Sequence, residues 1–222
     1  MSLARRAAAE ALGTALLLAA VVGSGIMGER LAGGNVAIAL LANSLATGFA
    51  LIALIVAFGP RSGAHFNPVV TVALALKGSF SKEEVIHYAA AQFLGALAGV
   101  GLAHAMFDLP LLQSQERMRS GAGQWLSEGV ATFGLVFLVL GLDRRTAWAA
   151  PFAVGAYIAA AYWFTASTSF ANPAVTLARG FTATFAGIRL ADVGPFIACQ
   201  LAGGAAALVA DRALRARQST AA

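Results

Sequence analysis

Charged residues are scarce in this sequence. Only 11% of its 222 residues are Asp, Glu, Lys or Arg, whereas 59% are hydrophobic, and a soluble globular domain carries about 25% charged residues. Ten acids and fifteen bases cannot cover the surface of a water-soluble protein of this length. The composition therefore excludes a disordered chain and an ordinary soluble enzyme. It favours one membrane domain, residues 1–222, whose outer surface is solvated by the lipid bilayer.

Cysteine is almost absent. Cys199 is the single cysteine, so the chain cannot form an internal disulfide. Its place in an apolar run indicates a buried thiol. No spacing of Cys and His indicates a metal site, so we expect neither a metal nor a cofactor. The basic residues are too scattered to form a nucleic-acid-binding patch, and we expect no nucleic-acid partner.

Six apolar stretches are long enough to cross a bilayer, which takes about 20 helical residues for about 30 Å of hydrocarbon. The sequence therefore predicts an all-α membrane protein. The expected spans are residues 7–27, 35–58, 85–107, 125–142, 147–167 and 192–211.

Basic residues predict the orientation of these spans. With the N terminus inside, ten of the fifteen Lys and Arg residues fall on the cytoplasmic side, and this bias places both termini in the cytoplasm. The cytoplasmic set is Arg5, Arg6, Arg61, Lys77, Lys82, Arg144, Arg145, Arg212, Arg215 and Arg217, and the outer set is Arg30, Arg117, Arg119, Arg179 and Arg189.

Two shorter apolar segments lie between the spans and resemble each other. Residues 67–80 read NPVVTVALALKGSF, and residues 172–185 read NPAVTLARGFTATF. They align without a gap and share Asn, Pro, the second Val, Thr, Ala and the final Phe. The likeness extends outward to Glu-x-x-x-Thr and Gln-x-x-Gly patterns that begin at Glu10, Glu128, Gln92 and Gln200.

This pattern predicts an internal duplication, with repeats at about 7–107 and 125–211. Each repeat holds three spans and one short segment, and an odd number of crossings inverts the second repeat relative to the first. Inverted repeats with interrupted segments place a permeation pathway at their interface, near the membrane midplane.

Asn followed by Pro is a helix start, because Asn is a favoured N-cap and Pro is favoured at the first helical position. A helix from Asn67 to Lys77 is about 16 Å long, roughly half a bilayer. Two such half-helices entering from opposite sides would bring Asn67 and Asn172 together at the centre. Their side-chain oxygens cap the helices, which leaves amide donors facing the space between them. Two positive helix ends would oppose cations and proton relay while admitting neutral hydrogen-bonding solutes.

The segment Ser62–Val69, SGAHFNPV, resembles the first signature of the aquaporin, or major intrinsic protein, family, with Val69 where the family has Ala. Asn172-Pro-Ala resembles the second signature unchanged. The resemblance covers nearly the whole chain and implies a right-handed bundle of six transmembrane helices and two re-entrant half-helices. It implies homotetramers with one pore per subunit. At the pore midplane it places Asn67, Pro68, Val69, Asn172, Pro173 and Ala174.

The resemblance also implies roles for three buried polar residues. Glu10 and Glu128 brace the backbones of the two half-helix loops, and His65 fixes its loop near the pore. Catalysis or proton transfer by the two intramembrane carboxylates is the alternative reading.

Carrying the family's outer constriction over by spacing gives Thr47, Ala160, Ser169 and Val175. Water-selective members typically place an aromatic residue, His, a small residue and Arg here, and glycerol-passing members keep the Arg. Val175 takes the Arg position, and none of the four residues is aromatic. A wide, uncharged mouth that passes solutes larger than water is therefore expected. Arg179 lies one helical turn beyond Val175, and we do not expect it to replace the missing Arg.

Residues 162–175, YWFTASTSFANPAV, also resemble a bacterial subgroup associated with arsenic-resistance operons. That resemblance implies flux of arsenite as neutral As(OH)3, together with glycerol and water, through a passive channel in a bacterial-type inner membrane. The alternatives are a general water or glycerol channel and a coupled secondary transporter, for which the Asn pair supplies no midplane carboxylate. An intramembrane hydrolase lacks a nucleophile motif, so we expect no enzyme.

Overall fold

The computed structural model describes residues 1–142 and 146–219, and every regular element in this part of the chain is a helix. Arg144 and Arg145, which enter the orientation argument, lie outside the described residues. The α-helices are α1 Leu3–Leu31, α2 Val36–Ser62, α3 Pro68–Lys77, α4 Val85–Met106, α5 Ala122–Gly141, α6 Ala150–Phe164, α7 Pro173–Ala178 and α8 Leu190–Ser219. Short 3-10 turns are η1 Lys82–Glu84, η2 Ala147–Ala149 and η3 Arg179–Phe181. The predicted all-α class is confirmed.

Five helices are long and apolar enough to cross a membrane, namely α1, α2, α5, α8 and the run formed by η1 and α4. The remaining predicted span corresponds to α6, which has 15 residues and is preceded directly by η2. This helix ends at Phe164 because Thr165 adopts an extended conformation and begins the loop that leads to α7. The expected span 147–167 therefore extends into a loop at its C-terminal end.

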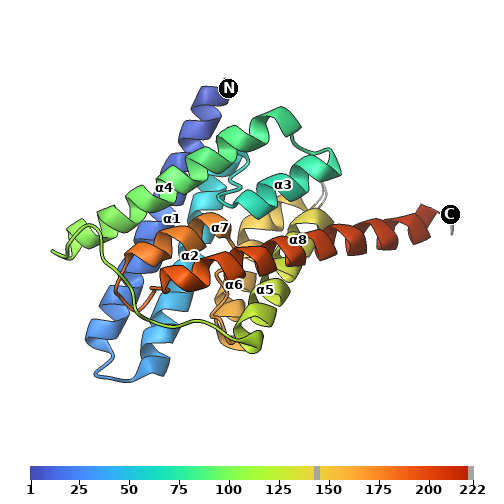
Figure 1. Cartoon of the computed structure of the whole chain (residues 1–222). Coiled ribbons are helices and arrows are strands. Elements are labelled where there is room, and N and C mark those ends of the chain that lie inside the picture. The colour runs from blue at the N-terminus through green and yellow to red at the C-terminus, as the bar shows by residue number, and fades with distance from the viewer. Residues whose placement is uncertain (143–145, 220–222) are drawn as a thin grey trace.

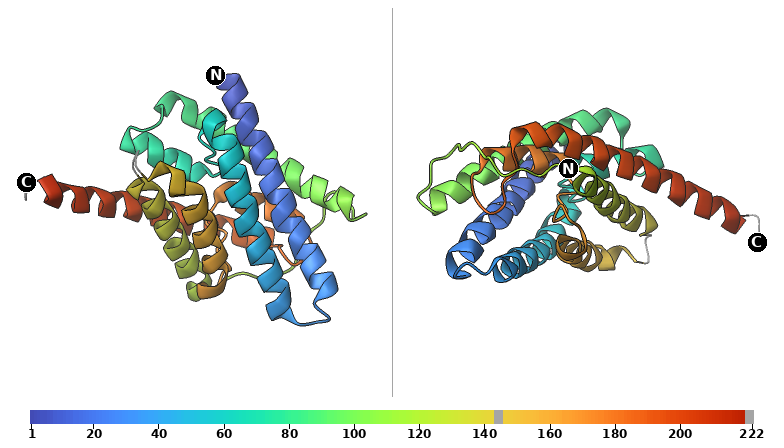
Figure 2. Two further views of the ribbon diagram at one scale, coloured as in Figure 1. Left: turned by 180° about the vertical axis from the view of Figure 1, so that it is seen from behind. Right: turned by 60° about the horizontal axis from the view of Figure 1, so that its bottom comes forward.

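Two pairs of long helices organise the bundle. α1 packs along α4, and α5 packs along α8, while α2 packs against both α1 and α6. Figures 1 and 2 show α1 and α2 side by side, and α8 continuing past the bundle toward the C terminus. The short helices α3 and α7 contact each other, and both also contact α4 and α8. The two half-helices are thus held between the long pairs.

Glycine permits the closest of these approaches. A Cβ added to Gly95 or Gly99 of α4 would overlap the carbonyl oxygens of Ala11 or Ala15 in α1. In the other pair, a Cβ on Gly203 of α8 would overlap the carbonyl of Gly129 in α5. Small residues at helix interfaces let membrane helices pack backbone to backbone, and both pairs use this device.

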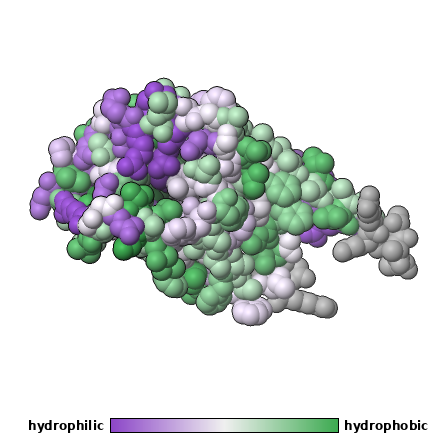
Figure 3. Space-filling model, turned by 90° about the horizontal axis from the view of Figure 1, so that it is seen from below, coloured by the Kyte–Doolittle hydropathy of each residue, from purple (hydrophilic) through white to green (hydrophobic). Residues whose placement is uncertain are grey.

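Large apolar side chains cover much of the outside of the bundle. Phe49, Ile86, Leu94 and Leu126 are each at least 65% exposed. Figure 3 shows hydrophilic residues gathered on one part of one face, with hydrophobic surface over most of the rest. A water-soluble monomer rarely presents this much contiguous apolar surface, whereas hydrocarbon chains solvate it well.

Candidate functional site

The loops that lead into α3 and α7 share an unusual backbone conformation. The third and the first residues before each Asn have positive φ, at Ala64 and Phe66 in one loop and at Ser169 and Ala171 in the other. Non-glycine residues seldom adopt this region, and each instance costs about 1–3 kcal/mol and persists only where the surrounding structure imposes it. The matching positions show that the two loops present their backbones in the same way.

A buried carboxylate holds each loop in this conformation. Glu10 accepts hydrogen bonds from the backbone N–H groups of His65 and Phe66 at 3.0 and 2.7 Å. Glu128 accepts the equivalent bonds from Phe170 and Ala171 at 2.8 and 2.9 Å. Both carboxylates are fully buried. The structure therefore places them against the loop backbones, which is the bracing position that the family resemblance implied.

A glutamine ties each carboxylate to the neighbouring half-helix. Gln92 donates to Glu10 at 2.9 Å and to the hydroxyl of Thr71 at 3.0 Å, and Thr71 donates to the carbonyl of Asn67. The second half repeats this network with Gln200, Glu128, Thr176 and Asn172. Sequence reasoning assigned no role to the two threonines, although Asn-Pro-x-x-Thr occurs in both segments.

Asn67 and Asn172 cap the two half-helices. Asn67 accepts from the N–H of Val69 at 3.0 Å, and Asn172 accepts from Ala174 and Val175 at 3.0 and 3.3 Å. Pro68 and Pro173 are the first helical residues, as the Asn-Pro pattern predicts.

The two amides also connect the halves to each other. Asn67 donates to the carbonyl of Ala171, and Asn172 donates to the carbonyl of Phe66, both at 2.8 Å. We expected all the amide donors to face the open space. Because a side-chain amide has two N–H donors, these bonds use one donor on each Asn and leave the other.

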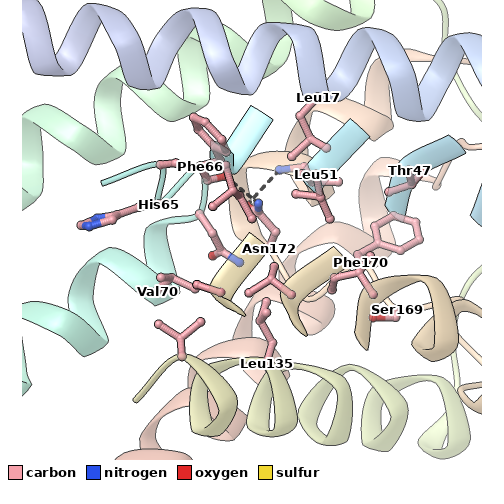
Figure 4. A pocket seen from close by; sticks show the side chains of 18 of the residues that line it. Leu17, Thr47, Leu51, His65, Phe66, Val70, Leu135, Ser169, Phe170 and Asn172 are labelled. Carbon is pink, nitrogen blue, oxygen red and sulfur yellow. Dashed lines mark hydrogen bonds between the residues drawn. The ribbon is translucent and has the colours of Figure 1, made fainter. Parts of the chain in front are cut away.

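A cavity of about 140 Å³ lies beside these two amides. A space of about 10–15 Å³ already holds one water molecule, so several fit. Figure 4 shows Asn172 in the middle, next to Phe66, with His65 toward one end and Thr47 toward the other. One face of α6 follows the cavity at four-residue intervals, from Ala150 to Tyr162, a length of about 18 Å at the helical rise. The cavity is therefore elongated along the bundle.

The lining is mostly apolar with a few polar groups. Leu17, Leu51, Val70 and Leu135 supply the apolar part from four different helices. The polar lining residues are Thr47, His65, Asn67, Tyr162, Ser169, Asn172 and Arg179. His65 also contacts Thr71 through Nδ1 at 3.1 Å and packs against the rings of Phe80 and Tyr88. No described lining residue is Asp or Glu.

Three of the four predicted constriction residues, Thr47, Ser169 and Val175, line this cavity. The prediction for Ala160 is wrong, because this residue is exposed on the outside of α6 and does not line the cavity. Its neighbours Ile158 and Tyr162 do, and the Tyr162 hydroxyl lies 3.3 Å from that of Thr47.

Of the six residues predicted at the pore midplane, some line the cavity and the others do not. Asn67 and Asn172 line the cavity, whereas Pro68, Val69, Pro173 and Ala174 are buried in the half-helices without lining it. Tyr162 and Arg179 also line the cavity, so its lining as a whole includes an aromatic ring and a charged group. Within residues 1–142 and 146–219, no group of three His, Cys, Asp or Glu side chains is placed to hold a metal.

Membrane-spanning helices around a cavity with two half-helix starts at its middle define a membrane channel. Residues 1–169 match the family model described as Major intrinsic protein, and the chain belongs to this family. Its members are passive channels, which confirms that the protein is not an enzyme and is a multi-pass membrane protein.

Individual relatives agree with this assignment. The chain is 55% identical over 206 residues to Aquaglyceroporin AqpS of Rhizobium meliloti, covering 93% of this chain and 88% of that protein. It is 31% identical over 218 residues to Aquaporin Z of Bradyrhizobium diazoefficiens, covering 90% and 89%. The crystal structure of the aquaglyceroporin from Plasmodium falciparum superposes with a TM-score of 0.75 at 20% identity, covering 96% of this chain and 97% of that one. This last likeness shows the shared fold.

Proposed function

We propose that the protein is a passive channel for small uncharged solutes, namely water, glycerol and neutral metalloid hydroxides such as As(OH)3, and that it excludes protons and ions. The observation that carries this proposal is the pair of capped Asn residues, bonded across the two halves beside one elongated cavity. Each amide keeps one donor for a passing oxygen atom. A solute that offers hydroxyl or water oxygens can meet both donors in turn.

The charge pattern of the lining supports selection of neutral solutes. The described lining has amide and guanidinium donors but no carboxylate to bind a cation. A water held oxygen-first by the amides has its hydrogens directed away from them, which opposes proton relay. The start of the ten-residue helix α3 adds a positive end to the same region.

Glycerol and metalloid hydroxides are proposed on separate grounds. The relative AqpS is named an aquaglyceroporin, and Val175 and Ser169 offer small side chains to the lining of the cavity. Arsenite enters through the resemblance of residues 162–175 to channels of arsenic-resistance operons, because As(OH)3 has a polyol-like shape. Tyr162 and Arg179 add a ring and a charged group to the lining that the four residues predicted from spacing lack, which favours compact solutes.

Assembly and location complete the proposal. We infer a homotetramer in the inner membrane with one pore per subunit and both termini in the cytoplasm, built as a single channel domain of two inverted repeats at about 7–107 and 125–211. The equivalent Glu, Gln and Thr networks support the repeats. The ten-to-five bias of basic residues supports the orientation.

Stopped-flow measurements on proteoliposomes test the function. Wild-type vesicles should take up water, glycerol and arsenite faster than empty vesicles, linearly with concentration and without an ion gradient. Ile158→Trp should block all three fluxes, because it places an indole in the cavity. Ala160→Trp is the matched control, since that residue lies two positions away on the outside of the same helix.

Each rival gives a different result. Saturating uptake that depends on an ion gradient would indicate a coupled transporter. Uptake of water or glycerol without arsenite would indicate a general channel. Equal block by Ile158→Trp and Ala160→Trp in folded protein would show that the cavity is not the pathway.

A further inference from the structure

Arg179 is a buried cation that faces the cavity. It follows α7 directly as its C-cap, and only 1% of its surface is exposed. It lines the same cavity as Val175, and Val175 lies one helical turn before it in the chain. The side chain thus reaches the pathway from the turn next to the position where the family resemblance placed an arginine.

The protein fixes this guanidinium without neutralising it. Its Nε donates to the carbonyl of Ala186, and its Cζ lies 3.4 Å from the ring centroid of Phe170. Phe196 packs edge-on against the same ring at 5.4 Å. Among the described residues, no carboxylate lies within ion-pair distance of Arg179. Buried charges are usually paired. Because this one lies beside a cavity without a carboxylate partner, we expect its hydrogen-bond acceptors to be solutes that pass through the cavity.

The unused donors of Arg179 supply the contact for such a partner. Within the described part of the chain, its two terminal nitrogens donate to no acceptor. Neither nitrogen is fully enclosed by protein. These nitrogens carry four of the five N–H donors of the guanidinium, and the open space that remains for them is the cavity.

A second arginine on the same ring shows the contrast. Arg119 lies 5.1 Å from the centroid of Phe170, but it donates to the carbonyls of Gly187 and Ser167 at 3.0 Å and does not line the cavity. Burial lowers the pKa of Arg119 to about 9, with the charges of Arg179 and Arg117 acting in the same direction, so it stays protonated at neutral pH. Arg119 uses its donors to hold loops together, whereas Arg179 keeps most of its donors for the cavity.

We propose that Arg179 is a specificity-determining residue of the channel, one helical turn from Val175, which repels cations and donates hydrogen bonds to the oxygens of neutral solutes. This inference rests on the proposed channel function. It differs from the expectation that Arg179 does not replace the arginine missing at Val175. A solute in the outer part of the pathway meets a charged donor next to the smaller Val175, so charge rejection and width are set by different side chains.

The test compares cation leak in proteoliposomes that hold wild-type protein, Arg179→Met or Arg119→Met. Each change is also made in an Asn67→Asp chain. In that chain the cation barrier at the Asn pair is expected to be weaker, so it cannot hide the loss of a barrier at Arg179. Arg179→Met should raise Na⁺ leak per assembled channel by about tenfold or more in that chain, because a full charge is lost at short range. Arg119→Met should lower thermal stability and leave the leak unchanged.

Arg179→Lys provides a second measurement if the neutral variant does not assemble. A buried lysine loses its proton more readily than arginine. Its leak should therefore rise between about pH 7 and pH 9, a range in which the wild-type arginine stays charged and its leak stays flat. The inference is overturned if folded Arg179→Met leaks no more than Arg119→Met, both in the wild-type chain and in the Asn67→Asp chain. It is also overturned if the leak of folded Arg179→Lys does not change with pH. Wild-type vesicles that pass no more glycerol than empty vesicles would instead overturn the channel function itself.

Discussion

At the scale of single residues, Val175 lines the cavity at the position where the family resemblance placed an arginine, and we expect it to set the width there. Val175→Arg would add a guanidinium with five donors in place of an isopropyl group. Glycerol and arsenite flux should fall several-fold more than water flux, because only the larger solutes need the lost width. The ratio of water to glycerol permeability in the same vesicles measures this change. Val175→Leu is the uncharged control, and an unchanged ratio in folded Val175→Arg would remove Val175 from the selectivity region.

We expect the two Asn residues to contribute to ion exclusion at the centre of the cavity. Asn67→Asp or Asn172→Asp replaces an amide donor with a carboxylate next to the carbonyl that it bonded, Ala171 or Phe66. We expect a higher cation conductance and a lower thermal stability, since the lost donor leaves a negative group against a carbonyl. Asn35→Asp is the matched control, because Asn35 caps α2 through the same side-chain oxygen but is exposed. Near-zero conductance in both pore variants would contradict this account.

Glu10 and Glu128 accept hydrogen bonds from the backbones of the two loops, and we expect these bonds to stabilise the loops. Glu10→Ala leaves the buried N–H of Phe66 and the partly buried N–H of His65 without an acceptor, and each buried unsatisfied group costs about 1–3 kcal/mol. We expect Glu10→Ala and Glu128→Ala to lower the yield of folded protein and its thermal stability, with Glu10→Gln intermediate. Glu29→Ala, at an exposed position of α1, serves as the control. If both variants keep wild-type stability and lose all flux, the carboxylates do more than brace the loops.

The sequence predicted the residues that recur in both halves better than it predicted the constriction residue on α6, for a physical reason. Glu10 and Asn67 were found because their patterns recur in the second half, and a repeated pattern does not depend on knowing where a helix begins. Ala160 was placed by counting back from Asn172 through a loop whose conformation the sequence does not give. An error of two residues turns a side chain by about 200° around a helix, which separates exposed Ala160 from lining Tyr162.

At the scale of elements, the half-helices differ although their sequences align. α3 extends from Pro68 to Lys77, close to the predicted length, whereas α7 ends at Ala178 and continues as the 3-10 turn η3. The carbonyl of Arg179 accepts the N–H of Ile188, and its Nε reaches Ala186. These contacts fold the chain back after one and a half turns, so alignment predicted the helix start but not its end.

The contact between α1 and α4 offers a prediction at the same scale. Gly95→Ala would push a methyl group into the carbonyl of Ala11 and force the two helices apart. We expect thermal stability to fall, in the range of about 1–3 kcal/mol typical of overpacking. Gly101→Ala is the control on the same helix, because nothing lies within 4 Å of its added methyl. Equal stability of the two variants would show that the helices can separate at little cost.

At the scale of the whole molecule, the amide donor of the central Asn in each half finds its acceptor in the other half. The donor of Asn67 finds its acceptor 104 residues further along the chain, and that of Asn172 finds its acceptor 106 residues back. A chain cut at Ser114, between α4 and α5, should therefore give two fragments that are unstable alone and pass glycerol when expressed together. Co-purification and flux in vesicles measure this. Asn172→Ala in the second fragment should weaken the recovery, and a first fragment that is stable by itself would refute the interdependence.

The same reciprocal bonds set an order of events during synthesis. When α4 has been inserted, Asn67 and Phe66 are already in the membrane, but the groups that they bond have not yet been made. Until residues 171 and 172 emerge from the ribosome, the amide of Asn67 and the carbonyl of Phe66 must therefore either lack these partners or hydrogen-bond to water. We therefore expect that half of the chain does not form a working channel, and that interrupted synthesis leaves no leaking half-pore in the membrane.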